Sequence, residues 1–131
     1  MKTLKTILYA TFFITSIALF SSCEKEQTDT TVPVFTIAEP LAGDTVSGEA
    51  HIEFTVTDNV GLKELVVKIT NSVGTAVYTQ NSKVKDLKVF SFHDHYDLAA
   101  YSAITPLTVI LTAMDKSGNT KTNEIPIIVK P

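Results

Sequence analysis

The chain has 131 residues, among them 11 lysines, 14 aspartates and glutamates, three histidines, one cysteine and no arginine. A formal net charge of −3 excludes the basic surface that nucleic acid binding requires. Without arginine, the chain also lacks the bidentate donors that usually hold phosphates. A single cysteine also excludes an intramolecular disulfide framework.

The first 22 residues are typical of an export signal. Lys2 and Lys5 precede a segment, residues 7–20, that is apolar apart from scattered threonine and serine. A transmembrane helix needs roughly 20 apolar residues, so this segment is too short to be one. We therefore expect residues 1–22 to be removed as a lipoprotein signal peptide. Nine lysines and 14 acidic residues then remain, which makes the mature chain more acidic than the precursor.

Cys23 follows directly after the apolar segment. The run Leu19-Phe20-Ser21-Ser22-Cys23 resembles a lipobox, in which an apolar residue and two small residues precede a cysteine that receives a diacylglyceryl group. Two or three acyl chains give the stable membrane attachment that one chain does not. We expect Cys23 to be the lipidated, palmitate-bearing first residue of the mature protein. The alternative is an ordinary signal peptide followed by a chance free cysteine.

Residues 23–32 are polar and have no hydrophobic periodicity. The run Glu24-Lys25-Glu26 resembles the charged tag of Bacteroidetes lipoproteins that are sent to the outer face of the outer membrane. It is equally compatible with the solvated start of a linker. The threonine-rich residues that follow indicate a flexible tether. The expected location is therefore the outer membrane, with a lipid anchor and exposure at the cell surface.

From residue 33 onward, apolar and polar residues tend to alternate, and turn-forming residues recur at intervals of roughly 8 to 15 residues. This pattern predicts an all-β domain over residues 33–131. About seven strands in this length indicate an immunoglobulin-like antiparallel β-sandwich. The expected strands cover residues 34–38, 45–46, 50–57, 62–70, 75–80, 87–96, 107–114 and 120–129. Pro126 marks a sheet edge or a bulge, because proline cannot donate to a ladder.

Two turns carry recognisable motifs. Thr57-Asp58-Asn59-Val60-Gly61-Leu62 and Ala113-Met114-Asp115-Lys116-Ser117-Gly118-Asn119-Thr120 resemble the paired turn signatures of bacterial Ig-like modules. Together with the lipobox, they resemble an uncharacterised family of short, histidine-bearing Ig-like lipoproteins of the Bacteroidetes, a domain of unknown function. The resemblance implies the fold and the location and does not imply an activity.

All three histidines fall in one predicted patch. His51 begins one predicted strand, while His93 and His95 end another that is its antiparallel neighbour in an Ig-like sandwich. By alternation, all three side chains leave on the outer face together with Glu53, and facing residues lie about 5 Å apart. Imidazoles joined by a carboxylate suit a Zn or Cu class ion. The alternative is a solvated strand end without a ligand.

Asp58 and Asp115 lie on the two motif turns, which meet at the same pole of an Ig sandwich. Two carboxylates, with Asn59 and turn carbonyls, offer the oxygen ligands that Ca²⁺ prefers. The alternative is that each carboxylate accepts hydrogen bonds from the backbone of its own turn.

No catalytic motif accompanies these groups. The chain has no nucleophile elbow, phosphate loop or metalloprotease motif, and lipid consumes its only cysteine. We therefore expect a protein that is not an enzyme. The first expectation is a lipid-anchored binding or adhesion module for a protein or glycan partner. The second is a metal-binding surface lipoprotein that uses the histidine patch. The third is an accessory subunit of an outer-membrane nutrient-uptake complex.

Overall fold

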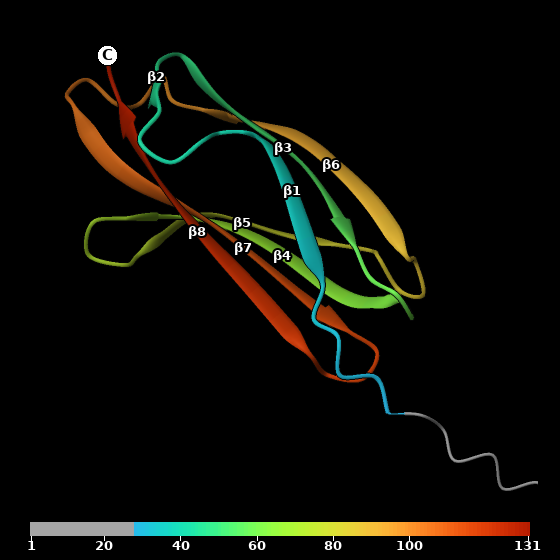
Figure 1. The fold of residues 1–131 in the computed structure, drawn as a ribbon. Helices are drawn as coiled ribbons and strands as arrows, with labels where there is room; N and C mark the ends of the chain where they lie inside the picture. Colours follow the sequence, from blue (N-terminus) through green and yellow to red (C-terminus); the bar gives the residue numbers. More distant parts are fainter. Residues whose placement is uncertain (1–27) are drawn as a thin grey trace, which may run out of the picture.

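The computed structural model describes residues 28–131, which form eight β-strands (Figure 1). The predicted signal peptide and Cys23 lie outside these residues. Within them, no helix is long and apolar enough to cross a membrane. The strands are β1 (Val34–Glu39), β2 (Thr45–Val46), β3 (Glu49–Thr57), β4 (Leu62–Asn71), β5 (Ala76–Ser82), β6 (Val89–Asp97), β7 (Thr105–Asp115) and β8 (Thr120–Val129).

The strands form two sheets, and in Figure 1 these are the two layers of a sandwich. One sheet has the order β1-β3-β6 and the other the order β2-β8-β7-β4-β5. All neighbours are antiparallel except β2, which pairs in parallel with β8. The predicted all-β sandwich is confirmed. The count is eight strands because the predicted two-residue strand β2 forms as well.

The hydrophobic core lies between the sheets and follows from alternation along the strands. On β3, Ala50, Ile52, Phe54 and Val56 are at most 2% exposed, while the residues between them face outward. Leucine, isoleucine and valine side chains of β4, β7 and β8 meet them from the other sheet. Because a slip of one residue would turn the apolar set to solvent, this core fixes the register of β3 and of the strands beside it.

Pro126 lies where β8 has no strand partner on its outer side, because β2 pairs only with Ile128 and Val129. Pro126 pairs with Thr108 in an unbroken β7–β8 ladder, so it causes no bulge. Its carbonyl accepts a hydrogen bond from Gly43 N at 2.8 Å, in the loop before β2. In an antiparallel strand the nitrogen and the carbonyl of one residue face the same side. The nitrogen of Pro126 therefore also faces this loop. Because it does not point toward β7, its lack of a hydrogen removes no hydrogen bond from the β7–β8 ladder.

The two poles of the sandwich are distinct. In the view of Figure 1 the described chain begins at the lower pole, where the β3–β4 and β7–β8 turns also lie. The start of β3, the end of β6 and β2 lie toward the upper pole. The histidines and the turn aspartates of the sequence analysis thus occupy separate regions.

Candidate metal centre

The antiparallel β3–β6 ladder brings the three predicted histidines together. His51 on β3 pairs directly with His95 on β6, and Glu53 pairs with His93. His93 and His95 are two residues apart, so they leave the strand on the same side. All of these side chains lie on the outer face of the three-stranded sheet, because their neighbours Ile52 and the phenylalanines of β6 fill the inner face.

The imidazole nitrogens are close enough to serve a single ion. One ring nitrogen from each of His51, His93 and His95 lies within 4.8 Å of the other two. The ring centroids are 4.2 Å apart for His51 and His95 and 4.9 Å apart for His93 and His95. Nitrogen ligands of a tetrahedral Zn²⁺ ion are about 3.4 Å apart, given Zn–N bonds of about 2.05 Å. The rings therefore have to close by about 1.4 Å at most, which side-chain rotation can supply.

The three rings lie at the surface, so an ion can reach them from solvent. The side chains of His51 and His95 are 45% and 40% exposed. The backbone beneath them belongs to a continuous ladder without a register shift from Glu49 to Thr57. A rigid backbone with accessible, rotatable ligands limits the reorganisation that binding would require.

Two carboxylates that were not predicted contact the histidines. Glu49 Oε1 lies 3.0 Å from His51 Nε2 and 3.5 Å from His95 Nδ1, so it bridges the facing rings. Glu39 Oε2 lies 3.9 Å from His51 Nδ1. A carboxylate that holds a ligating imidazole fixes the ring orientation and raises its basicity. Glu49 was discoverable from the sequence, because it precedes His51 by two residues on the same face.

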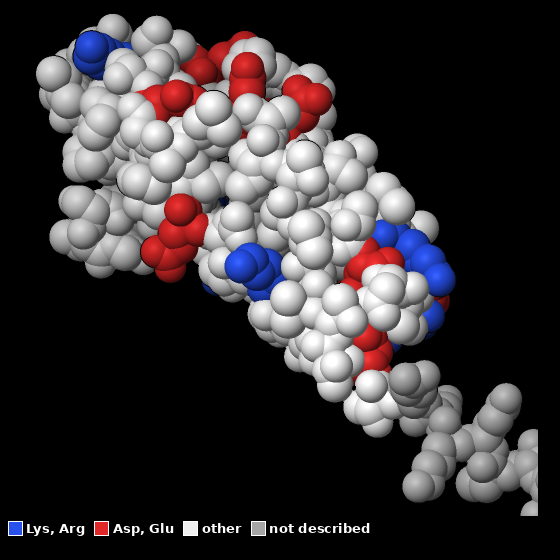
Figure 2. Space-filling view, in the orientation of Figure 1, with Lys and Arg blue, Asp and Glu red and all other residues white. Residues whose placement is uncertain are grey.

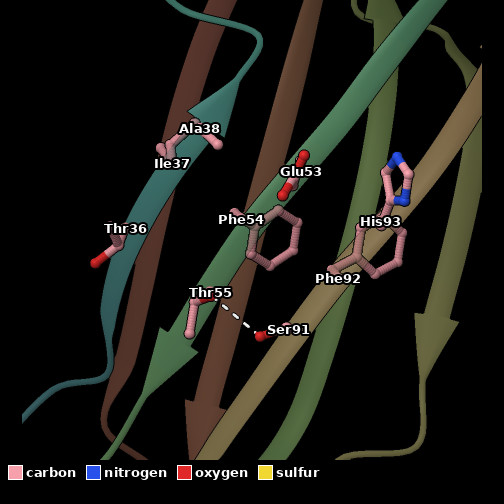
Figure 3. A pocket seen from close by; sticks show the side chains of 9 residues that line it. All are labelled: Thr36, Ile37, Ala38, Glu53, Phe54, Thr55, Ser91, Phe92 and His93. Atoms are coloured by element: carbon pink, nitrogen blue, oxygen red, sulfur yellow. Dashed lines mark hydrogen bonds between the residues drawn. The ribbon is translucent and has the colours of Figure 1, made fainter.

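Glu53 faces the same side as the histidines, as predicted, but it is not one of the atoms that converge. The group of ligand atoms within 4.8 Å of one another comprises the three imidazoles alone. Glu53 and His93 instead border a neighbouring depression of about 240 Å³, which Thr36, Thr55 and Ser91 also line (Figure 3). Glu49 is thus the carboxylate that contacts two of the rings, and Glu53 as a metal ligand stays a prediction.

Asp94 anchors β6 between the two histidines of this strand. Its side chain points away from theirs and accepts a short hydrogen bond from the Tyr78 hydroxyl on β5, which belongs to the other sheet. This bond holds the pKa of Asp94 below its usual value, and the backbone amide of His95 adds to the effect. Burial and the same carboxylate raise the pKa of Tyr78. Because β5 and β6 are edge strands of the two sheets, the contact between Tyr78 and Asp94 joins the sheets at this edge of the sandwich, beneath the histidines.

The predicted turn aspartates also meet, at the lower pole. Asp58 Oδ1 accepts hydrogen bonds from Val60 N at 3.0 Å and Gly61 N at 2.6 Å, and Asp115 Oδ1 accepts one from Asn119 N at 2.8 Å. Both carboxylates therefore do hold their own turns, as one of the two interpretations expected. Asp29 was missed, although one of its oxygens lies within 4.8 Å of an oxygen of each.

Asp29 falls in the predicted tether, of which residues 28–32 belong to the described part of the chain. Asn59 Nδ2 donates to Asp29 Oδ1 at 3.0 Å, and Asn119 Nδ2 donates to the Asp29 carbonyl at the same distance. This end of the tether segment is therefore bonded to both motif turns. Nothing in its composition indicates this, since its partners lie 30 and 90 residues away.

Comparison with known proteins gives no match to a family model and none to a curated protein. Among solved structures, the chain is similar to CopC from Methylosinus trichosporium OB3b. The identity is 16%, the match covers 75% of this chain and 95% of that chain, and the TM-score is 0.49. A likeness at this level does not bear on function.

Proposed function

We propose that this chain is a metal-binding protein that holds one transition-metal ion of the Zn or Cu class on His51, His93 and His95. The convergence of one nitrogen from each imidazole within 4.8 Å carries this proposal. Of the functions expected from the sequence, metal binding is the one that a specific arrangement of described residues supports. Protein or glycan adhesion has no such arrangement in its favour among residues 28–131.

The donor set selects the class of metal. Three imidazoles suit Zn²⁺ and Cu²⁺, whereas Ca²⁺ and Mg²⁺ prefer oxygen ligands. Three protein ligands leave a further coordination position for water or for a ligand from another molecule. Because the rings are at the surface, such a site can exchange its metal, which fits a protein that captures or delivers an ion better than one that buries it.

The electrostatic surroundings favour cations. Glu39, Glu49 and Glu53 lie on or beside the histidine face, and Figure 2 shows acidic residues gathered toward the upper pole, where β3 begins. A concentration of negative charge raises the local cation concentration and the rate of capture. Glu49 also orients two of the three rings, which reduces the ordering that metal binding must bring about.

The proposed setting is the cell envelope. Cys23 as a lipidated residue would attach the chain to the outer membrane, with the metal centre at the pole of the sandwich away from the start of the described chain. This part of the proposal is supported by the lipobox sequence and the preceding apolar segment.

The direct test is a calorimetric titration of the protein, purified in detergent, with Zn²⁺ and with Cu²⁺. One ion should bind per chain, and replacing any of the three histidines by alanine should weaken binding at least about tenfold, or about 1.4 kcal/mol. Ser91→Ala is the matched control, because Ser91 is exposed on the same face of β6, two residues before His93. Binding no tighter than about 1 mM, or unchanged affinity in His51→Ala, would overturn the proposal.

A further inference from the structure

Three carboxylates from distant parts of the chain meet at the lower pole. Asp29 precedes β1, Asp58 begins the β3–β4 turn and Asp115 ends β7. One oxygen of each lies within 4.8 Å of an oxygen of the other two. Asp58 is 8% exposed and Asp115 is fully buried, so these are not solvated surface acids.

Two of the oxygens in this group are buried and have no hydrogen-bond partner. Both hydrogen bonds of Asp58 go to Oδ1, which leaves Oδ2 unpartnered. Likewise Asp29 Oδ1 accepts bonds from Thr31 N and from Asn59, while Asp29 Oδ2 has none. A buried carboxylate oxygen without a partner is strongly destabilising, so it indicates a ligand that supplies the missing interaction.

The charge of the group points to a cation as that ligand. None of the ion pairs formed within residues 28–131 involves these three carboxylates. Lys116, which directly follows Asp115, is paired with Asp86 instead. Three neighbouring carboxylates without a counter-charge repel one another, and burial increases that repulsion.

We propose that Asp29, Asp58 and Asp115 bind one Ca²⁺ ion that clamps the segment before β1 onto the two motif turns. Ca²⁺ binds oxygens at about 2.4 Å, so ligands on opposite sides of the ion are about 4.8 Å apart, and three oxygens within this separation of one another can share one ion. Mg²⁺ demands near-ideal octahedral geometry and gives up its water reluctantly, so a cluster of protein carboxylates suits Ca²⁺ better. A hollow of about 310 Å³ beside Asp29, lined by residues 28–31, Asn59 and Val60, gives water access to complete the coordination.

The clamp would fix how the domain leaves its anchor. Asp29 lies only six residues after Cys23. With the ion bound, residue 29 is held to the β3–β4 and β7–β8 turns, and the free length of chain between lipid and domain is short. Without the ion, the hydrogen bonds that join Asp29 to the two turns are those from Asn59 and Asn119. Calcium would thereby set the orientation of the sandwich at the membrane, independently of the histidine centre.

The test is the melting temperature of the protein in detergent as Ca²⁺ is added up to about 10 mM, above the range of extracellular calcium modules. The melting temperature should rise with Ca²⁺, and Asp29→Asn should weaken the apparent affinity at least about tenfold without affecting the turns. Asp58→Asn should do the same, although it also alters its turn. Asp86→Asn is the control, because it removes a nearby negative charge that belongs to the Lys116 pair.

A second readout isolates the clamp from general stabilisation. Backbone amide signals of residues 29–31 should shift on addition of Ca²⁺ and should saturate at one equivalent. A melting temperature that Ca²⁺ leaves unchanged would overturn the site. Unchanged affinity in Asp29→Asn would overturn the clamp, and Mg²⁺ binding as tight as that of Ca²⁺ would overturn the assignment of the ion.

Discussion

His51 on β3 faces His95 on β6 directly across the antiparallel ladder, with ring centroids 4.2 Å apart and planes inclined by 70°. The register that exposes these two rings is the one that buries Ala50 and Ile52 on either side of His51. Packing of the core therefore determines the geometry of the surface site. Any change that shifts this register would separate the histidines as well as disrupt the core.

Glu49→Gln should weaken binding of Zn²⁺ by about 10-fold to 100-fold, the usual effect of removing a carboxylate that orients a ligating imidazole. Glu49 contacts His51 at 3.0 Å and His95 at 3.5 Å, and glutamine retains its size without its charge. Competition with a chromogenic chelator measures the affinity. Glu64→Gln is the control, since Glu64 is exposed on β4 in the other sheet. Equal affinities of the two variants would show that Glu49 does not act on the rings.

Phe54→Ala should lower the free energy of unfolding by about 3 to 5 kcal/mol, as expected for loss of a large buried aromatic side chain. The Phe54 ring stacks on Phe92 at 5.0 Å and meets Phe35 edge-on at 5.5 Å. Urea denaturation measures the change. Val73→Ala is the control, because Val73 is 82% exposed and its loss should change stability by less than about 0.5 kcal/mol. A loss below about 1 kcal/mol in Phe54→Ala would contradict the packing described here.

Asp86 should give the folded state a pH-dependent stabilisation. The hydrogen bond and charge of Lys116 lower the pKa of Asp86 from its ordinary value of 3.8. A carboxyl group with a lower pKa in the folded state stabilises that state above pH 3.8, and this contribution is lost as the pH falls through the lowered pKa.

Urea midpoints at about pH 5 and about pH 3 measure this effect in the wild type and in Asp86→Asn. The variant should lose less stability than the wild type on acidification, because asparagine does not titrate. The two proteins should then differ more at the higher pH. The same loss in both would contradict a role for this pair. The effect should be small, because both side chains are exposed and the pair is screened by salt.

Cys23→Ala should abolish membrane attachment. In cells fed with labelled palmitate, the wild type should incorporate label and partition into the detergent phase, whereas the variant should do neither. Labelled Cys23→Ala protein would show that the lipid is attached elsewhere.

The positions of strands such as β3 and β7 were predictable from the sequence because buried and less buried residues alternate along them. The two-residue alternation around Ile52 and Phe54, together with the Ig-like strand order, was enough to place all three histidines on one face. The choice of Glu53 as their carboxylate partner followed from the same alternation. Glu49, on the same face, contacts two of the rings, whereas Glu53 borders the adjoining depression.

Two residues of the candidate sites, Glu39 and Asp29, could not be predicted from the sequence for physical reasons. Glu39 reaches His51 only because the β1–β3 register shifts between Ile37 and Glu39, and a local irregularity of this kind has no signature in composition. Asp29 sits in a polar, threonine-rich segment that predicts a free tether. Its contacts to Asn59 and Asn119 arise only once the fold has brought the two motif turns together.

The most direct test of the metal centre is to follow the imidazole nitrogens themselves. Long-range proton–nitrogen NMR spectra of the ¹⁵N-labelled protein should show ring signals of His51, His93 and His95 changing together on addition of Zn²⁺. The signal changes of all three rings should be complete at one equivalent of Zn²⁺. One nitrogen of each ring should move to the chemical shift of a metal-bound nitrogen. If only one or two rings respond, or if the signals keep shifting well beyond one equivalent, the three histidines do not form a single site.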